Sequence, residues 1–154
     1  MLIKEIKDKD KKYDIAKSIL DDLPEWFGIA EAKEEYAFES KSMPFFAAIQ
    51  NEKEVGFLSI KSNNIYTAEI YVMGIKKDYH RKGIGRDLFK ACYGWCKEQG
   101  FEFLQVKTLD ESHPDMNYRM TREYYLSMGF RPLECFPSLW GEANPCLILI
   151  MAIK

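Results

Sequence analysis

The sequence has no long apolar run and almost no histidine. No stretch approaches the ~20 consecutive apolar residues of a membrane-spanning helix, and the first residues, Met1-Leu2-Ile3, lead straight into Lys4 and Glu5 rather than into a signal peptide. The 2 histidines and 4 cysteines show no metal-ligand spacing. We therefore expect no membrane contact, no metal, and a reducing, cytoplasmic setting.

An excess of charge of either sign is also missing. The chain has 22 Lys and Arg against 24 Asp and Glu, which gives a formal net charge of −2, and its basic residues are scattered. This balance argues against nucleic acid as the main partner. With 154 residues, of which 47% are hydrophobic, the chain can form a real core, and we expect a single domain over residues 1–154.

Apolar periodicity and turn residues predict a mixed α/β domain. The expected strands cover residues 2–6, 45–49, 55–60, 65–75, 101–109, 131–136 and 146–153. The expected helices run from a cap at Asp8 or Asp10 to Pro24, over 29–38, from 83 to 100, and from a cap at Ser112 or Asp115 to 128. The order is therefore β-α-α-β-β-β-α-β-α-β-β, and the two strands joined by the third helix should be parallel.

The turn before the third expected helix holds two glycines and three basic residues. Gly83 and Gly85 stand where this helix begins, although a glycine lowers helix propensity by about 1 kcal/mol relative to alanine. The first turn of a helix has unpaired N–H groups and a partial positive charge, to which Arg81, Lys82 and Arg86 add full charges. A phosphate or pyrophosphate site and a tight turn with solvated basic residues explain these features equally well.

Two motifs resemble those of a known family. His80-x-x-Gly83-x-Gly85 resembles the acetyl-CoA pyrophosphate loop of the GNAT N-acetyltransferase superfamily, Gln/Arg-x-x-Gly-x-Gly/Ala, with His80 where Gln or Arg is usual. Residues 124–130, YYLSMGF, resemble the family ending Phe-Tyr-x-x-x-Gly-Phe. The resemblance implies the GNAT fold, a mixed α/β sheet in the order given above, over essentially the whole chain. It also implies acetyl-CoA as cosubstrate and a chemistry that needs no metal.

By the same resemblance, the strand before the glycine turn splays from its neighbour and pairs with the pantetheine arm. A backbone N–H near Met73 would polarise the thioester carbonyl, and Gly74 would either allow close approach of the ligand or mark a bulge. Arg122 would bind a phosphate or form a surface salt bridge. The implied cofactor residues are Met73, Gly74, Ile75, His80, Arg81, Lys82, Gly83, Ile84, Gly85, Arg86, Asn117, Thr121 and Arg122.

One tyrosine and one glutamate are the candidate catalytic residues. Tyr125 matches the family tyrosine assigned as general acid to the CoA thiolate, and the alternative is that it packs in the core. A lysine-like amine is almost entirely charged at neutral pH, so a proton acceptor is expected. Glu69 on the central strand is the first candidate for this general base, with Glu25, Glu31 and His113 as alternatives.

Aromatic and acidic residues mix in the segment 21–28, which the resemblance makes one wall of the acceptor groove. Glu25, Trp26 and Phe27 are its candidate substrate residues, and its negative charge would favour a cationic amine. The alternative is that the aromatic residues plug the edge of the core and the carboxylates are solvated. Trp140, in the proline-bounded loop 137–145, would lie on the opposite wall.

The function that the resemblance implies is acetyl transfer from acetyl-CoA to a primary amine of a small-molecule or peptidic acceptor. The alternative is a CoA-binding sensor or scaffold without turnover, which would keep the glycine turn but lack an open acceptor groove. Tyr125 and the segment 21–28 favour the enzyme. A homodimer is a further expectation, because the last strands in this family often meet a partner subunit.

Overall fold

The computed structural model describes all 154 residues and confirms the expected order of helices and strands. The strands are β1 (Leu2–Glu5), β2 (Phe45–Gln50), β3 (Lys53–Ser62), β4 (Thr67–Ile75), β5 (Phe103–Leu109), β6 (Arg131–Phe136) and β7 (Cys146–Ala152). The helices are α1 (Lys9–Asp21), α2 (Ala30–Ser40), α3 (Ile84–Glu98) and α4 (Met116–Met128). A short 3₁₀ turn at Lys77–Tyr79, just after β4, is an element that the sequence did not predict.

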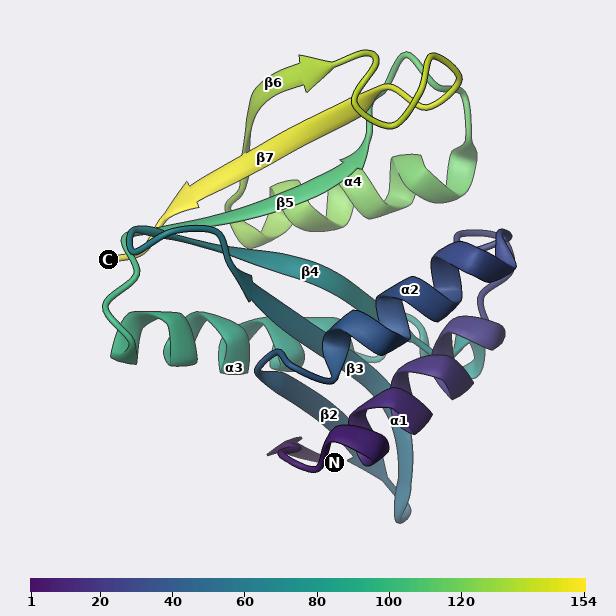
Figure 1. Ribbon diagram of the computed structural model, residues 1–154, viewed down its shortest axis with the longest axis vertical. Coiled ribbons are helices and arrows are strands. Elements are labelled where there is room, and N and C mark those ends of the chain that lie inside the picture. The colour runs from purple at the N-terminus through teal and green to yellow at the C-terminus, as the bar shows by residue number, and fades with distance from the viewer.

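All strands belong to one mixed, 7-stranded sheet in the order β1-β2-β3-β4-β5-β7-β6 (Figure 1). β4 and β5 are parallel, whereas every other neighbouring pair is antiparallel. The prediction of a parallel pair joined by a helix is therefore confirmed for β4, α3 and β5. Because a parallel pair needs such a crossover, α3 lies against one face of the sheet.

The pairing between β4 and β5 ends early. It runs from Thr67 opposite Phe103 to Ile70 opposite Val106, although both strands continue beyond these residues. Each strand stays paired on its other side, β4 with β3 and β5 with β7. The sheet therefore splits into a V after Ile70, as the family resemblance predicts, and one edge of β4 is left without a strand partner.

The helices cover opposite faces of the sheet (Figure 1). α1 and α2 pack on one face, where Ile19 and Phe57 belong to the same buried cluster. α3 and α4 pack on the other face, where Leu88, Val106 and Tyr125 belong to a second cluster. The second cluster also includes residues of β3 and β4 as well as β5 and β7, so one core joins the two arms of the V, whereas the first cluster packs on the β2–β4 arm.

A β-bulge lies in β4 at Tyr71. Ser59 of β3 lies opposite Val72 and Ile60 lies opposite Ile70, so Tyr71 has no partner between them. The bulge sends Ile70 into the core under α3 and Val72 into the core under α1. Regular strand alternation would put Ile70 and Val72 on the same face, and the inserted residue shifts this alternation.

Gly74 does not mark a bulge, because it lies opposite Phe57 in regular register. A Cβ on Gly74 would approach Leu23 Cδ1 to 3.1 Å and Ile19 Cγ2 to 3.2 Å. The glycine thus lets the end of α1 pack closely on β4. This packing brings the connection between α1 and α2 next to the open edge of β4.

Aspartates cap two of the helices. Asp8 accepts a hydrogen bond from Lys11 N–H at 2.9 Å at the start of α1, and Asp115 accepts from Asn117 and Tyr118 N–H at the start of α4. Both belong to the predicted alternatives, and such a cap stabilises a helix by about 1 kcal/mol. None of the helices combines the length and the apolar character that a membrane crossing requires.

Two isoleucines allow a matched test of the α1 core. Ile19 is 0% exposed between α1 and the sheet, whereas Ile65 is 77% exposed in the turn before β4. We expect Ile19→Ala to lower the free energy of unfolding by about 2–5 kcal/mol, because a cavity replaces packed methyl groups. Ile65→Ala should change it by less than about 0.5 kcal/mol. Urea unfolding followed by circular dichroism measures both, and equal effects would contradict this assignment of the core.

Candidate active site

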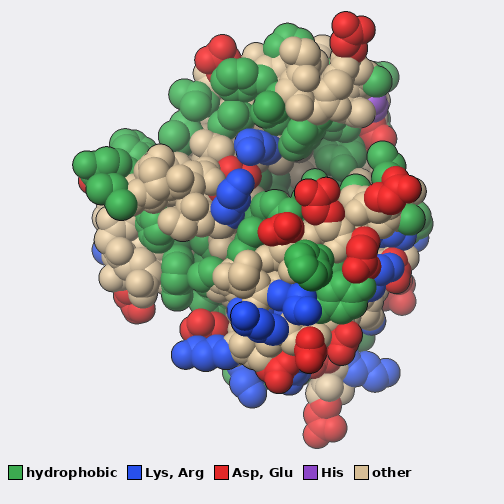
Figure 2. All heavy atoms as spheres, in the orientation of Figure 1, with side chains coloured by type: hydrophobic (Ala, Val, Ile, Leu, Met, Phe, Trp, Pro, Cys, Tyr) green, Lys and Arg blue, Asp and Glu red, His purple; other side chains and the backbone are tan.

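A cleft of about 650 Å³ lies where the sheet splits. Its lining comes from β4, β5, the α1–α2 connection, the glycine turn, α2, α3, α4 and the β6–β7 loop. Figure 2 shows the surface hollowed between the part that holds α4 and β5–β7 and the part that holds α1 and α2. Because the lining includes Tyr36 from one face of the sheet and Tyr125 from the other, the cleft passes through the split.

The glycine turn has an unusual backbone and leads into an uncapped helix. Gly83 is the N-cap of α3 with a φ of 81°, a value that favours glycine, and Arg81 also has a positive φ of 61°. No side chain caps α3, and its first internal bond runs from Asp87 N–H to Gly83 C=O at 3.1 Å. The N–H groups of residues 84–86 therefore lie free at the positive end of the helix dipole.

Gly85 is required for packing rather than for its backbone conformation. A Cβ at this position would lie 3.1 Å from Tyr124 Oη and 3.2 Å from Ile75 Cδ1. Tyr124 Oη donates a hydrogen bond to Gly85 C=O at 2.7 Å. The contact holds α4 against the first turn of α3, so the tyrosine that precedes Tyr125 supports the glycine turn.

The open edge of β4 presents backbone groups to the cleft. Lys76 N–H bonds to Val55 C=O, on the β3 side, at 2.9 Å. Because the backbone groups of successive residues point to opposite sides of a strand, those of Ile75 and Met73 point away from β3 and into the split. His80 Nε2–H donates to Ile75 C=O at 2.6 Å and occupies that acceptor. Met73 N–H, Met73 C=O and Ile75 N–H remain available to a ligand.

Tyr125 lies across the cleft from this edge. It is 6% exposed, belongs to the cleft lining, and packs edge-on against Phe130 with ring centroids 5.6 Å apart. Burial raises the pKa of its hydroxyl. Thr108 of β5 also belongs to the lining, and its buried hydroxyl has no hydrogen-bond partner in the protein. Such orphaned groups are rare, so Thr108 is a further polar atom that a ligand could satisfy.

The α1–α2 connection reaches across the split to α4. Trp26 Nε1 donates to Asn117 C=O at 3.3 Å, and Tyr118 Oη donates to Trp26 C=O at 2.7 Å. The indole also stands edge-on to His80, with ring centroids 5.6 Å apart. The connection is thus tied to both α4 and the glycine turn, and it forms a wall of the cleft as the resemblance implies.

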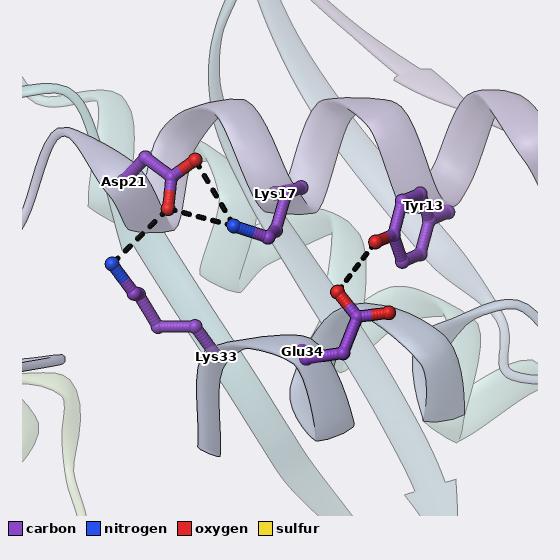
Figure 3. Close-up of polar contacts among 5 residues, drawn as sticks. All are labelled: Tyr13, Lys17, Asp21, Lys33 and Glu34. Atoms are coloured by element: carbon purple, nitrogen blue, oxygen red, sulfur yellow. Dashed lines mark hydrogen bonds and ion pairs between the residues drawn. The ribbon is translucent and has the colours of Figure 1, made fainter. Parts of the chain in front are cut away.

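Lysines neutralise the carboxylates of this wall. Lys77 Nζ pairs with Glu25 at 3.0 Å, and this hydrogen bond lowers the pKa of Glu25. Lys17 and Lys33 pair with Asp21 at 3.0 and 3.1 Å (Figure 3). Neither carboxylate lines the cleft. The geometry therefore does not support the interpretation that negative charge on this wall attracts a cationic amine.

Glu69 is buried beside the cleft rather than in its lining, at 4% exposure. Its Oε1 accepts hydrogen bonds from Asn63 Nδ2 at 3.0 Å and from Gln105 Nε2 at 2.8 Å. Its Oε2 lies 3.6 Å from Lys107 Nζ, and Lys107 does line the cleft. Glu69 is thus connected to the cleft by its ion pair with Lys107. Its role as the general base stays a prediction.

The cleft gathers most of the residues predicted from the sequence. Those that line it are Met73, Gly74, Ile75, His80, Arg81, Gly83, Ile84, Gly85, Arg86, Thr121, Tyr125, Trp26, Phe27 and Trp140. Those outside its lining are Lys82, Asn117, Arg122, Glu25 and Glu69.

Two further residues outside the lining, in addition to Glu25 and Glu69, contact other groups of the protein. Arg122 donates to Leu109 C=O at 2.8 Å and to Asp110 C=O at 3.3 Å, so its guanidinium holds the end of β5. Lys82 Nζ lies over the Tyr79 ring, 5.5 Å from its centroid. No group of three or more His, Cys, Asp or Glu side chains is arranged to hold a metal ion.

Sequence reasoning missed many residues of the lining, and five of them have long polar or aromatic side chains that matter for the site. These are Tyr36, Tyr71, Lys107, Tyr118 and Tyr124. Tyr124 is the first residue of the second motif, next to Tyr125, and this position was the only indication in the sequence that it could lie in the site. The other four come from α2, β4, β5 and α4, and no spacing in the chain relates them. Only the folding of these elements around the split brings them together.

Burial raises the pKa of five tyrosines of the lining. It raises the pKa of Tyr118 to about 12, and it also raises the pKa values of Tyr36, Tyr71, Tyr124 and Tyr125. The unfolded chain releases these protons near pH ~10, before the folded chain does. The free energy of unfolding should therefore decrease as the pH rises above ~10 and be insensitive to these groups below pH ~9.

Urea unfolding at a series of pH values measures this dependence, and tyrosinate absorbance of the folded protein follows the ionisation directly. Tyr118→Phe should weaken the alkaline decrease, because it removes one of the five groups. Ionisation of all tyrosines of the folded protein near pH ~10 would contradict the burial of these side chains.

Comparison with known proteins agrees with this geometry. The model of the family described as Acetyltransferase (GNAT) family matches residues 12–130. No curated protein matches the sequence. Aminoglycoside 6'-acetyltransferase type Ii has a similar crystal structure, with a TM-score of 0.80 and 19% identity, covering 100% of this chain and 98% of that one.

Two further structures show the same likeness of fold. An aminoglycoside 6'-N-acetyltransferase complexed with coenzyme A has a TM-score of 0.79 and 17% identity, covering 100% of this chain and 98% of that one. The ribosomal-protein-S18-alanine N-acetyltransferase from Escherichia coli has a TM-score of 0.76 and 18% identity, covering 99% and 94%. The family match spans well over half of the sequence, and the chain therefore belongs to the GNAT acetyltransferase family.

Proposed function

We propose that the protein transfers the acetyl group of acetyl-CoA to a primary amine of a small-molecule or peptidic acceptor, by direct attack in a ternary complex. The observation that carries this proposal is the open edge of β4, which lies beside the uncapped end of α3 and across the cleft from Tyr125. Family membership supports the same chemistry. A cleft open to both faces of the sheet allows cosubstrate and amine to approach from opposite sides.

The residues of the glycine turn fit the diphosphate of acetyl-CoA. The free N–H groups of residues 84–86 supply donors, and the guanidinium groups of Arg81 and Arg86 in the lining supply full positive charges. Gly83 and Gly85 have no side chains that would cover these amides. Lys82, exposed next to them, adds to the positive field.

Acetyl-CoA supplies an acetyl group activated as a thioester. Ile75 N–H and Met73 C=O, on the open edge of β4, would bind the pantetheine arm. Met73 N–H would donate a hydrogen bond to the thioester carbonyl as negative charge develops on its oxygen. One donor of this kind is worth roughly 10²–10³ in kcat when it is removed from other acyl-transfer enzymes.

The proton transfers involve Tyr125 and the acceptor amine. The amine nitrogen bonds to the acetyl carbon while the bond from that carbon to the CoA sulfur breaks. Tyr125 would donate its proton to the leaving thiolate. A tyrosine holds this proton at neutral pH, and burial raises the pKa of Tyr125 further. Glu69 would take up the amine proton through water, because its carboxylate lies outside the cleft lining.

Two glycines of α3 provide a matched test of the diphosphate site. A Cβ at Gly83 or at Gly94 meets no atom within 4 Å, but only Gly83 has a positive φ. We expect Gly83→Val to shift the turn and weaken CoA binding at least about tenfold, or ~1.4 kcal/mol. Gly94→Val should leave the affinity unchanged. Titration calorimetry with CoA measures both, and unchanged affinity in a folded Gly83→Val protein would refute the diphosphate assignment.

Tyr125→Phe should lower kcat about 10²-fold with little change in CoA affinity, because it removes only the proton donor. Tyr124→Phe should instead weaken CoA binding, because it removes the hydrogen bond to Gly85. Tyr66→Phe is the control, since this side chain is 53% exposed and outside the cleft. Free-thiol release measures turnover, and an unaltered kcat of Tyr125→Phe at several pH values would remove Tyr125 from the mechanism.

The same assay separates the enzyme from a sensor without turnover. Polyamines, amino acids, aminoglycosides and peptides form a suitably broad panel of amines. Acetylation of at least one of them supports the proposed function. Tight CoA binding without acetylation of any of them would favour the sensor.

A further inference from the structure

We propose that the acceptor is a small arylalkylamine, bound on the α1/α2 face of the cleft. Such an amine has an aromatic ring on a short alkyl chain and a single, positively charged amino group; it is called the aromatic amine below. The inference rests on the proposed acetyl transfer and names the class of amine that the same cleft would take. Three features support it: a row of aromatic side chains, a wall with no carboxylate of α1 or α2 in the cleft lining, and a lysine that belongs to this lining.

The aromatic row runs from the α1–α2 connection to β4. Phe27 stands edge-on to Tyr36 with ring centroids 5.8 Å apart, and Tyr36 stands edge-on to Tyr71 at 5.4 Å. All three rings line the cleft, and Trp140 joins them from the β6–β7 loop at 40% exposure. Rings arranged in this way bind a further ring by edge-to-face or offset contact while burying its apolar surface.

The bulge in β4 directs Tyr71 toward this row. Tyr71 is the residue without a partner in β3, and bulges often re-aim a side chain next to an active site. Burial raises the pKa of Tyr71, and the neighbouring Tyr36, Glu35, Glu39 and Glu69 raise it further. Because even a solvated tyrosine holds its proton at neutral pH, the row presents neutral hydroxyl groups and no phenolate that would pair with a second ammonium group.

No carboxylate of α1 or α2 belongs to the cleft lining. Two of them are bound by other side chains between these helices, where Lys17 and Lys33 pair with Asp21, and Tyr13 donates to Glu34 (Figure 3). Glu35 and Glu39 of α2 lie outside the lining. A polycation bound in the cleft would therefore find no carboxylate of these helices in the lining.

Other acidic side chains near the cleft are also engaged. Glu25 pairs with Lys77 Nζ at 3.0 Å, and Asp22 accepts from Lys77 N–H at 2.8 Å. Glu123 of α4 is the one carboxylate in the cleft lining, where it pairs with Arg119 at 3.3 Å. Its side chain is 63% exposed, so this carboxylate is solvated and is not one of the groups packed against the aromatic rings.

Lys107 is the one basic residue of the cleft lining outside the glycine turn and the first turn of α3. Its Nζ lies 3.6 Å from Glu69, which is outside the lining, so within the cleft the lysine has no carboxylate partner. An acceptor with several ammonium groups would bring one of them close to Lys107, and like charges repel. An amine with one ammonium group avoids this repulsion, because that group is directed to the split where acetyl transfer would occur.

Thiol release with tryptamine, 2-phenylethylamine, hexylamine, spermidine and kanamycin tests the inference. We expect kcat/KM for the two aromatic amines to exceed that for the other three at least about tenfold. Tyr71→Leu should reduce the preference for tryptamine over hexylamine at least about threefold, whereas Tyr66→Leu in the exposed turn before β4 leaves it unchanged. Lys107→Gln should raise kcat/KM for spermidine relative to tryptamine.

Calorimetric binding of the same amines to the CoA complex distinguishes the two proposals. Preferential binding of tryptamine without acetylation would keep the aromatic site and overturn acetyl transfer. Turnover of spermidine or kanamycin equal to or faster than that of tryptamine would keep acetyl transfer and overturn the aromatic site. Absence of both binding and turnover for the aromatic amines would overturn the aromatic site as well.

Discussion

The early end of pairing between β4 and β5 is the constraint on which the whole site depends. After Ile70 the two strands diverge, and Met73 and Ile75 keep backbone donors that face no other strand. A backbone group that is buried without a hydrogen bond costs about 1–3 kcal/mol. A ligand that covers this edge therefore binds well only if it forms the hydrogen bonds that β5 does not form with β4. The core under α3 and α4 includes residues of both strands up to Ile70 and Val106, where their pairing ends, and the core under α1 and α2 packs on the continuation of β4 through Val72.

The walls of the split are joined to one another by a small number of polar contacts. Trp26 bonds to α4 through Asn117 and Tyr118 and stands against His80, whose imidazole bonds to the end of β4. Tyr124 ties α4 to the first turn of α3 through Gly85. The cosubstrate side and the acceptor side therefore share the same supports. The histidine in the first motif position has a structural partner of its own, the carbonyl group of Ile75.

Several carboxylates near the cleft form ion pairs and hydrogen bonds that stabilise the fold. Carboxylates near the acceptor wall, such as Asp21 and Glu25, are paired with lysines, and the buried Glu69 is bound by two amide side chains and Lys107. What remains facing the cleft on that side is aromatic. Counting acidic residues in the sequence therefore gave a misleading picture of the groove, because residues that are distant in the chain supply the countercharges.

Local patterns in the sequence determined the order of helices and strands, the aspartate caps, the parallel crossover and the glycine turn, since each depends on neighbouring residues. Recognition of two motifs also predicted the family and identified Tyr125 as a residue of the site, and Tyr125 does line the cleft. Tertiary structure alone decided the bulge at Tyr71, the partners of Glu69 and the aromatic row, because strand register and contacts between distant elements set them. A single inserted residue in β4 reverses the face on which every later side chain of the strand lies, and no local pattern records that insertion.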